Sequence, residues 1–362
     1  MAEPIDVGAE YGSAVDDYLT RAYDGDRCRA LLSAGGWDAG LAAELAELGW
    51  HGLAVPERHG GLGAPLSSLG PVFTALGRHL AVGPMLENTL LPAVLHPHWT
   101  IAPALAAAVE TGVPVALVDP GITDDRTADV GAMTLHDQRL SGAVEAVRFA
   151  GQASLLAVVA ATEAGEVVCF VDPTTPGVRI DSVDSADPAT AFARVALDDV
   201  RADGAAPADG GELVARIRSW ARLLIACELS GVADHALDRT VTYIGQREQF
   251  GQPIGSFQAV KHIAADMYAQ ATSLRNLCTA ALADATDAST ADLAVLAWTA
   301  KAHAAEVAVR VCEDAVQLHG GMGFTTESDV SACYLRTLAL RSWYGDATEL
   351  QLRIGAALLD RV

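Results

Sequence analysis

The stretch with the clearest chemical potential joins two long helical patterns in the C-terminal half of the 362-residue chain. It reads Arg247-Glu-Gln-Phe-Gly-Gln-Pro-Ile-Gly-Ser-Phe-Gln258. Arg247 carries a planar fork of donors that matches a pyrophosphate, and Phe250 offers a flat apolar face. Gln258 opens the second helical pattern, and the N-terminal end of a helix favours anions. On these residues alone, a capped turn with Arg247 in solvent is the simpler interpretation.

Apolar residues at three- and four-residue steps predict an amphipathic helix on each side of this corner. The first helix is predicted over residues 213–245 and the second over residues 257–282. The glycines and the proline between them break helical structure, and Ser256 is predicted to cap the second helix. We therefore expect a rigid turn from one helix to the next.

The charge and composition of the chain exclude several classes of protein. Acidic residues outnumber basic ones by 46 to 24, and the formal charge of -22 argues against a broad surface for nucleic acid or anionic membrane. The hydrophobic fraction of 51% predicts a folded chain, and no apolar run is long enough to span a bilayer. The acidic first residues lack the features of a signal peptide, and the six cysteines lack a C-x-x-C pair, so we expect a cytoplasmic protein. The ten histidines form no H-x-x-x-H pair, so no metal site is expected.

The corner sequence also carries a family resemblance. Its pattern of Arg, Phe-Gly, Ile and Gln between two long helices resembles the acyl-CoA dehydrogenase family. A second mark of that family is Gln317-Leu-His-Gly-Gly-Met-Gly-Phe324. A third is the segment from Leu48 to Gly63, which reads LGWHGLAVPERHGGLG. The three marks follow the order of the family and are spread over most of the chain.

The resemblance implies FAD as the cofactor, held mainly by a neighbouring subunit. In the family the corner binds the FAD diphosphate, while the Gln and the Gly-Gly of the second mark approach the adenine end. The residues that we expect to contact FAD are Arg247, Gln249, Phe250, Gln258, Gln317, Gly320 and Gly321.

The expected fold class is α+β, in the order helix, sheet, helix. The resemblance implies an N-terminal helical domain over residues 1–112, a small β-barrel-like domain over 113–209 and a C-terminal four-helix bundle over 210–362. The pattern in the first part predicts helices over residues 39–48, 66–80 and 101–109. Short apolar runs bounded by Gly, Asp and Pro predict strands at residues 113–118, 132–135, 155–159, 167–171 and 193–197.

Two family segments that hold the flavin ring match this chain poorly. The Thr-Glu-Pro-x-x-Gly-Ser segment falls on Leu117-Val-Asp-Pro-Gly-Ile-Thr123, where Asp119 and Pro120 survive without the following Gly-Ser. The Trp-Ile-Thr segment falls on Val147-Arg-Phe-Ala-Gly151, which has neither the indole nor the hydroxyl. The resemblance therefore implies a chain that is poorly equipped to hold its own flavin ring.

The catalytic base of the family is missing as well. In most members a Glu near the C-terminus removes a proton from the acyl-CoA thioester, and its position here is Gly345. In some members the base lies on the helix before the corner, and that position is Ala221. A shift of the match by one residue would place Tyr344 or Asp346 at the position of the base. Asp346 and Glu349 remain candidates for the base. The simpler interpretation is that Asp346 is the N-cap of the last helix, predicted over residues 347–359, with Glu349 in its first turn.

The losses are selective, because the residues that reach toward a neighbour's FAD are kept. The resemblance therefore favours a non-catalytic subunit of an actinobacterial α2β2 heterotetramer, which pairs with a catalytic acyl-CoA dehydrogenase subunit. Its substrates would be acyl-CoA thioesters, including CoA esters of sterol side chains, with an electron-transfer protein as acceptor. One alternative is a self-sufficient acyl-CoA dehydrogenase with an unusual base such as Asp346. Another is a structural or binding protein that keeps the fold without flavin.

Overall fold

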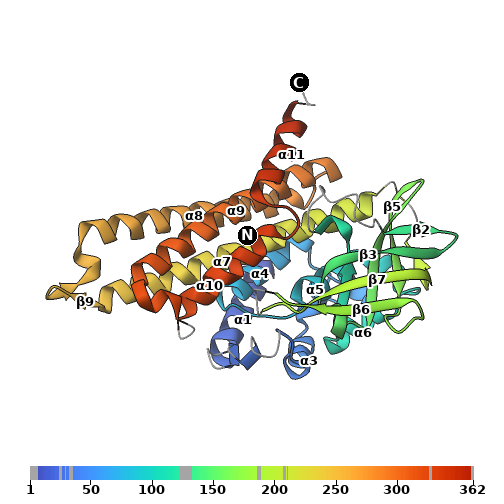
Figure 1. Cartoon of the computed structure of the whole chain (residues 1–362), viewed down its shortest axis with the longest axis horizontal. Helices are drawn as coiled ribbons and strands as arrows, with labels where there is room; N and C mark the ends of the chain where they lie inside the picture. Colours follow the sequence, from blue (N-terminus) through green and yellow to red (C-terminus); the bar gives the residue numbers. More distant parts are fainter. Residues whose placement is uncertain are drawn as a thin grey trace, which may run out of the picture. The chain divides into compact units, whose positions relative to one another are not determined.

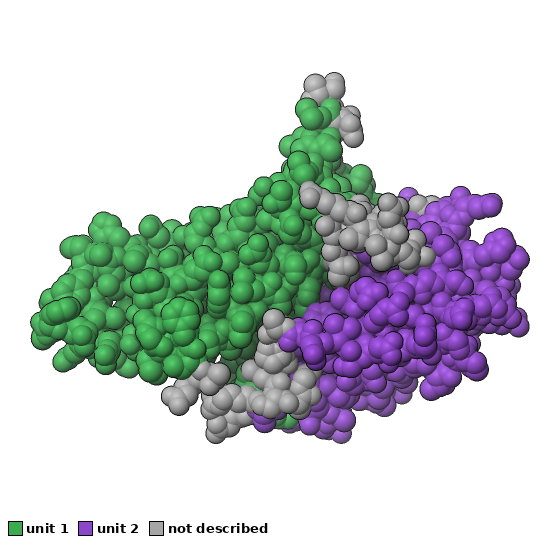
Figure 2. Space-filling view, viewed as in Figure 1, with its two compact units in different colours: residues 1–28, 69–81, 222–362 green, residues 29–68, 82–221 purple. Residues whose placement is uncertain are grey.

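The computed structural model describes residues 7–23, 27–28, 30–31, 36–122, 133–185, 189–206, 209, 211–325 and 328–359. Helices come first, a sheet follows, and long helices complete the chain (Figure 1), so the predicted α+β order is confirmed. The chain divides into two compact units (Figure 2). Unit 1 comprises residues 1–28, 69–81 and 222–362, and unit 2 comprises residues 29–68 and 82–221. The three domain boundaries drawn from the sequence remain a prediction.

The N-terminal part contains more helices than the sequence pattern indicated. The helices are α1 Val7–Ala22, α3 Ala39–Glu47, α4 Leu69–Arg78, α5 Met85–Leu95 and α6 Ala104–Thr111. The predictions for α3, α4 and α6 are confirmed, with ends that differ by a few residues. The sequence analysis did not single out α1 or α5, and α5 carries a proline inside the helix, which weakened its pattern.

The strands of unit 2 form one sheet. They are β1 Val115–Val118, β2 Thr134–His136, β3 Arg139–Arg148, β4 Leu155–Thr162, β5 Gly165–Val171, β6 Val178–Val183, β7 Phe192–Arg201 and β8 Gly204–Ala205. The order is β6-β7-β3-β2-β4-β5-β8, and β1 pairs in parallel with β4. The five predicted strands are present in the described residues. The strands β3 and β6 were missed because polar residues and glycine interrupt their apolar pattern, and β3 has irregular register against β7.

The C-terminal helices α7 to α10 form the bundle of Figure 1, and the short helix α11 projects from it. They are α7 Glu212–Gln246, α8 Gln258–Ala285, α9 Thr290–His319, α10 Asp329–Ser342 and α11 Ala347–Leu359. The two helices predicted beside the corner are therefore confirmed as α7 and α8. The prediction that α7 is amphipathic was wrong for its central part, because residues 223–234 are buried on every side. This pattern is typical of a helix at the centre of a bundle.

A buried ion pair joins α7 and α10 in unit 1. Arg336 Nε donates to Glu228 Oε1 at 2.9 Å, and both residues are 6% exposed. The Arg336 guanidinium also lies over the Trp343 ring, 5.2 Å from the centroid. None of the described helices is long and apolar enough to cross a membrane.

We predict that Arg336→Leu strongly destabilises the chain, because it leaves the Glu228 carboxylate buried without its partner. Breaking a buried pair in this way costs about 3–5 kcal/mol of unfolding free energy. The matched control is Arg78→Leu, since Arg78 pairs with Asp238 at 2.5 Å but both side chains are about half exposed. That change should cost about 1 kcal/mol or less. Urea unfolding measures both, and equal losses would contradict the assignment.

Candidate functional site

The corner between α7 and α8 is a two-residue hairpin. Short strands β9 Glu248–Gln249 and β10 Gln252–Pro253 pair in antiparallel fashion, and Figure 1 shows β9 at the left end of the bundle. Phe250 and Gly251 form the turn, with φ of 54° and 77°. Phe250 is 92% exposed and adopts a left-handed conformation that costs a non-glycine residue about 1–3 kcal/mol. An exposed aromatic residue held at this cost is a candidate ligand contact.

The backbone on either side holds Arg247 in place. The Arg247 N–H donates to the Tyr243 carbonyl at 2.8 Å, and the Ile254 N–H donates to the Arg247 carbonyl at 2.8 Å. The Arg247 side chain is exposed and makes no ion pair with any described residue. Its fork of donors is therefore available to an external anion.

The start of α8 differs from the prediction in one respect. Ser256 does not cap the helix, because its hydroxyl donates to the Pro253 carbonyl at 2.7 Å. The N-cap is Phe257, which contributes no side-chain hydrogen bond, and the exposed Gln258 is the first helical residue. The first amides of α8 thus have no side-chain cap of their own. The Phe257 ring packs edge-on against Phe250, with ring centroids 6.1 Å apart.

The second predicted stretch lies where α9 ends. The helix stops at His319, and a 3-10 turn, η9 Gly320–Phe324, follows. Gln317, Gly320 and Gly321 are all exposed. Gly320 has φ of 60° and ψ of -135°, a conformation that favours glycine. Gly321 does not adopt a conformation that favours glycine, and a Cβ added there would meet nothing within 4 Å. The fold itself therefore gives no reason for glycine at this position.

The structure brings these two stretches together within unit 1. The Tyr243 ring, near the end of α7, stacks on the His319 ring with centroids 4.3 Å apart and an interplanar angle of 20°. The corner and the end of α9 therefore lie at the same end of the bundle. All seven residues predicted to contact FAD are exposed. Exposure of this kind suits contacts that reach outward from the chain.

The turn at Gly345, where the resemblance predicts the usual base, contacts two buried basic side chains, Arg222 and Lys301. Gly345 has φ of 104° and, with Tyr344, forms the turn between α10 and α11. Arg222 Nε donates to the Tyr344 carbonyl at 2.8 Å. Lys301, which is fully buried, donates through Nζ to the carbonyls of Arg341 and Gly345 at 2.9 and 3.2 Å. Burial, with Arg222 nearby, lowers the pKa of Lys301 to about 7.

The remaining base candidates behave as the simpler interpretation predicts. Asp346 is exposed, and its Oδ1 accepts the Glu349 N–H at 2.9 Å in the first turn of α11. The N-cap interpretation of Asp346 is confirmed by this bond. The Glu349 carboxylate accepts from Arg353 on the same helix. Ala221, the other usual position, is a fully buried residue of α7 and has no ionisable group.

Lys301 is the residue that the sequence analysis missed. It lies on α9 among buried alanines spaced three, four and seven residues away, at positions 297, 304, 305 and 308. A lysine at that phase of a helix is aimed at the core, and this signal could have found it.

Four residues of the segment that is predicted to match a flavin-ring contact, residues 147–150, are buried in unit 2. Val147, Arg148, Phe149 and Ala150 are each at most 4% exposed. Arg148 lies 3.2 Å from the carboxylate of Glu87, which is equally buried. These residues present neither an indole nor a hydroxyl to a ligand, so they do not fit the ring of a bound flavin.

The other segment predicted to match a flavin-ring contact, residues 117–123, is joined to an ion-pair network through Asp119. The fully buried Asp119 accepts two hydrogen bonds from Arg218, at 2.6 and 2.9 Å. Arg218 also donates to both oxygens of Glu166 at 2.8 Å. The Asp119 side chain is therefore committed within unit 2. Thr123, the end of this segment, lies outside the described residues.

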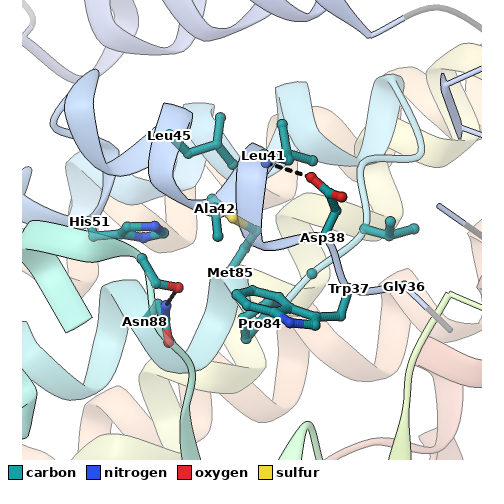
Figure 3. A pocket seen from close by; sticks show the side chains of 13 residues that line it. Gly36, Trp37, Asp38, Leu41, Ala42, Leu45, His51, Pro84, Met85 and Asn88 are labelled. Atoms are coloured by element: carbon teal, nitrogen blue, oxygen red, sulfur yellow. Dashed lines mark hydrogen bonds between the residues drawn. The ribbon is translucent and has the colours of Figure 1, made fainter. Parts of the chain in front are cut away.

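A pocket in unit 2 contains none of the predicted site residues. It lies between α3 and α5, and its space of about 280 Å³ includes open solvent. Figure 3 shows the His51 ring pointing into it, with Trp37 and Met85 among its apolar walls. His51 is 2% exposed, and neither ring nitrogen has a hydrogen-bond partner among the described residues. Burial lowers the pKa of His51 to about 4, so its ring is neutral near pH 7. The described residues contain no cluster that could hold a metal ion.

We predict that His51 makes the fold sensitive to acid. The pKa of His51 is about 4 in the folded chain and about 6.5 when unfolded, so the unfolded state binds the proton more tightly. The contribution of His51 to the unfolding free energy is fully present above about pH 6.5. As the pH falls toward 4, this contribution decreases by roughly 3 kcal/mol. His51→Phe should flatten the pH dependence of the urea midpoint in this window, while His136→Phe at an exposed position should not. An unchanged profile in His51→Phe would contradict the assignment.

Comparisons with known proteins agree with this geometry. The family model for the acyl-CoA dehydrogenase C-terminal domain matches residues 209–359. Acyl-CoA dehydrogenase IpdE2 of Mycobacterium tuberculosis is 32% identical over 85% of this chain and 83% of its own length. Acyl-CoA dehydrogenase FadE27 of the same organism is 30% identical over 95% of this chain and 91% of its own.

Solved structures of similar proteins share the fold over nearly the whole chain. The ChsE4-ChsE5 complex from Mycobacterium tuberculosis has a chain with a TM-score of 0.88 and 25% identity, covering 99% of this chain and 98% of that one. A variant of the Tcur3481-Tcur3483 steroid ACAD gives a TM-score of 0.87 and 27% identity, covering 98% of each chain. The protein belongs to the acyl-CoA dehydrogenase family.

Proposed function

We propose that this chain is the non-catalytic subunit of a heteromeric, FAD-dependent acyl-CoA dehydrogenase. It supplies the diphosphate and adenine contacts for FAD whose flavin ring is held by a catalytic partner. The observation that carries the proposal is a contrast in exposure. The seven expected FAD contacts are exposed, whereas residues 117–119 and 147–150, in the segments that would hold a flavin ring, are buried.

The half-site fits one end of a dinucleotide. Arg247 would bind the diphosphate, with the uncapped start of α8 at Gln258 adding backbone donors. Phe250 and Gln249 would pack beside it on the hairpin, and Gln317, Gly320 and Gly321 would approach the adenine. When bound, FAD accepts the hydride that leaves the acyl-CoA. The base that removes the proton would come from the partner.

The electrostatics around Gly345 support a subunit without a base. A catalytic carboxylate must be ionised and within hydrogen-bond reach of its proton. Here the turn contributes its carbonyls to Arg222 and Lys301, and the nearest carboxylate in sequence, Asp346, caps α11. A self-sufficient enzyme that uses Asp346 would have to release that cap.

The names of similar structures support a heteromer and a substrate class. The ChsE4-ChsE5 structure is described as a complex, and the Tcur3481-Tcur3483 structure as a steroid ACAD. We propose by analogy a catalytic subunit as the partner, in an α2β2 heterotetramer, and acyl-CoA thioesters with sterol-derived side chains as substrates. An electron-transfer protein would take up the electrons. The exposed Phe250, strained at the corner, weighs against a purely structural protein.

We predict that Arg247→Ala lowers the FAD content of the assembled heteromer although the partner is unchanged. A lost hydrogen bond to a charged group costs about 1.5–3 kcal/mol, which corresponds to roughly 10- to 100-fold weaker binding. Arg247→Lys should retain only part of the wild-type FAD content, because an ammonium cannot reproduce the planar fork of donors of the guanidinium. The exposed Arg21→Ala serves as the control for charge. FAD occupancy is measured on complexes checked by size-exclusion chromatography, and full occupancy in Arg247→Ala would refute the proposal.

We predict that Asp346→Asn leaves both stability and heteromer turnover nearly unchanged, because asparagine caps a helix about as well as aspartate. Asp346→Ala should lower the unfolding free energy by about 1 kcal/mol and leave turnover intact. Turnover and urea unfolding are measured on the same preparations. If Asp346 were the base, Asp346→Asn would slow turnover by about 10²–10⁴-fold, and the self-sufficient alternative would then stand.

A further inference from the structure

The stack of Tyr243 on His319 lies between the two exposed stretches of unit 1. Tyr243 lies one turn before Arg247, and His319 lies between Gln317 and Gly320. The two rings are 4.3 Å apart between centroids and close to parallel, and both residues are partly exposed. The ring stack therefore joins the stretch proposed for the diphosphate to the stretch proposed for the adenine.

Hydrogen bonds fix both partners of the stack. His319 Nδ1 lies 2.8 Å from the Ala315 carbonyl, and since a carbonyl only accepts, Nδ1 carries the proton. This bond sets the tautomer and the orientation of the ring. Burial lowers the pKa of His319, so the ring is neutral near pH 7. The Tyr243 hydroxyl also makes a long hydrogen bond of 3.5 Å to the His319 carbonyl.

Each partner is connected through its backbone to one half of the site. The Tyr243 carbonyl accepts the Arg247 N–H at 2.8 Å. This hydrogen bond holds the Arg247 backbone at the end of α7. On the other side, the Gly320 N–H donates back to α9, and the next residue is again a glycine. The backbone after His319 thus has no side chains of its own to anchor it, and the His319 ring is the last fixed group before the two glycines.

We infer that Tyr243 is a positioning residue that sets the spacing between the Arg247 corner and the Gly320–Gly321 turn, so that one dinucleotide meets both. The inference rests on the proposed function, because the ligand is the FAD shared with the partner. Tyr243 acts through its neighbours and not on the ligand itself. Its loss should therefore change FAD affinity while the bundle stays folded.

The test measures the FAD dissociation constant of the apo-heteromer reconstituted with Tyr243→Leu, Tyr243→Phe or the wild-type chain. Tyr243→Leu removes the ring stack, and we expect FAD binding to weaken about 3- to 10-fold. Tyr243→Phe keeps the stack and loses only a long hydrogen bond, so it should stay within about 3-fold of wild type. The matched control is Tyr268→Leu, an exposed tyrosine of α8 that should bind FAD as the wild type does.

A double-mutant cycle separates positioning from general destabilisation. If Tyr243 acts by placing the Arg247 corner, the effects of Tyr243→Leu and Arg247→Ala on the dissociation constant should be less than multiplicative when combined. The melting temperature of each isolated chain is recorded as well. His319→Leu removes the stack from the other side and should reproduce Tyr243→Leu, so it replaces that variant if the complex fails to assemble.

The outcomes distinguish this inference from the proposed function. Wild-type FAD affinity in Tyr243→Leu, together with weak binding in Arg247→Ala, would overturn the positioning role alone. Multiplicative effects in the cycle would overturn it as well. Wild-type affinity in both single variants would overturn the proposed function.

Discussion

Two buried basic side chains, Arg222 and Lys301, hold the turn between α10 and α11 in place. Arg222 and Lys301 together donate to the carbonyls of Arg341, Tyr344 and Gly345, in a region from which water is excluded. A buried ammonium is costly unless its donors are satisfied, and here main-chain carbonyls satisfy it. The turn is thus built to accept positive charge. The resemblance predicts the catalytic carboxylate of the family at this turn, where this chain has Gly345.

The candidate cofactor-binding stretches of the two units differ in exposure. In unit 2, the segments that correspond to flavin-ring contacts are closed by ion pairs of Arg148 with Glu87 and of Arg218 with Asp119. In unit 1, the stretches that correspond to contacts with a neighbour's FAD are exposed. Arg247 is exposed, and the backbone of the exposed Phe250 at the tip of the hairpin adopts a left-handed conformation. A chain that serves another subunit's cofactor would require this arrangement.

Sequence patterns predicted the parts whose apolar spacing is regular and local. The helices α7 and α8 and the strands β4 and β5 followed from such spacing, and Asp346 was correctly interpreted as a helix cap. The cap at Ser256 was wrong because its hydroxyl found a carbonyl within the turn. A prediction from propensity alone cannot choose between these two bonds.

The long-range contacts of the site could not be predicted from the sequence. Arg222 and Tyr344 are 122 residues apart, and Tyr243 and His319 are 76 apart. Each pair meets only because the long helices pack side by side. The buried Lys301 left a weak signal, since its helical phase coincides with that of the core alanines. The residues at the corner were recognised through a family resemblance, and their exposure became visible only in the folded chain.

The flavin content of the chain, purified alone and with its partner, tests the central claim most directly. The isolated chain should carry little FAD and no acyl-CoA dehydrogenase activity, because its ring-side segments are closed and it lacks a base. Co-expression with a catalytic acyl-CoA dehydrogenase subunit from the same genome should yield a yellow, active heteromer in which the two chains share each FAD. A yellow and active homo-oligomer of this chain alone would contradict the account.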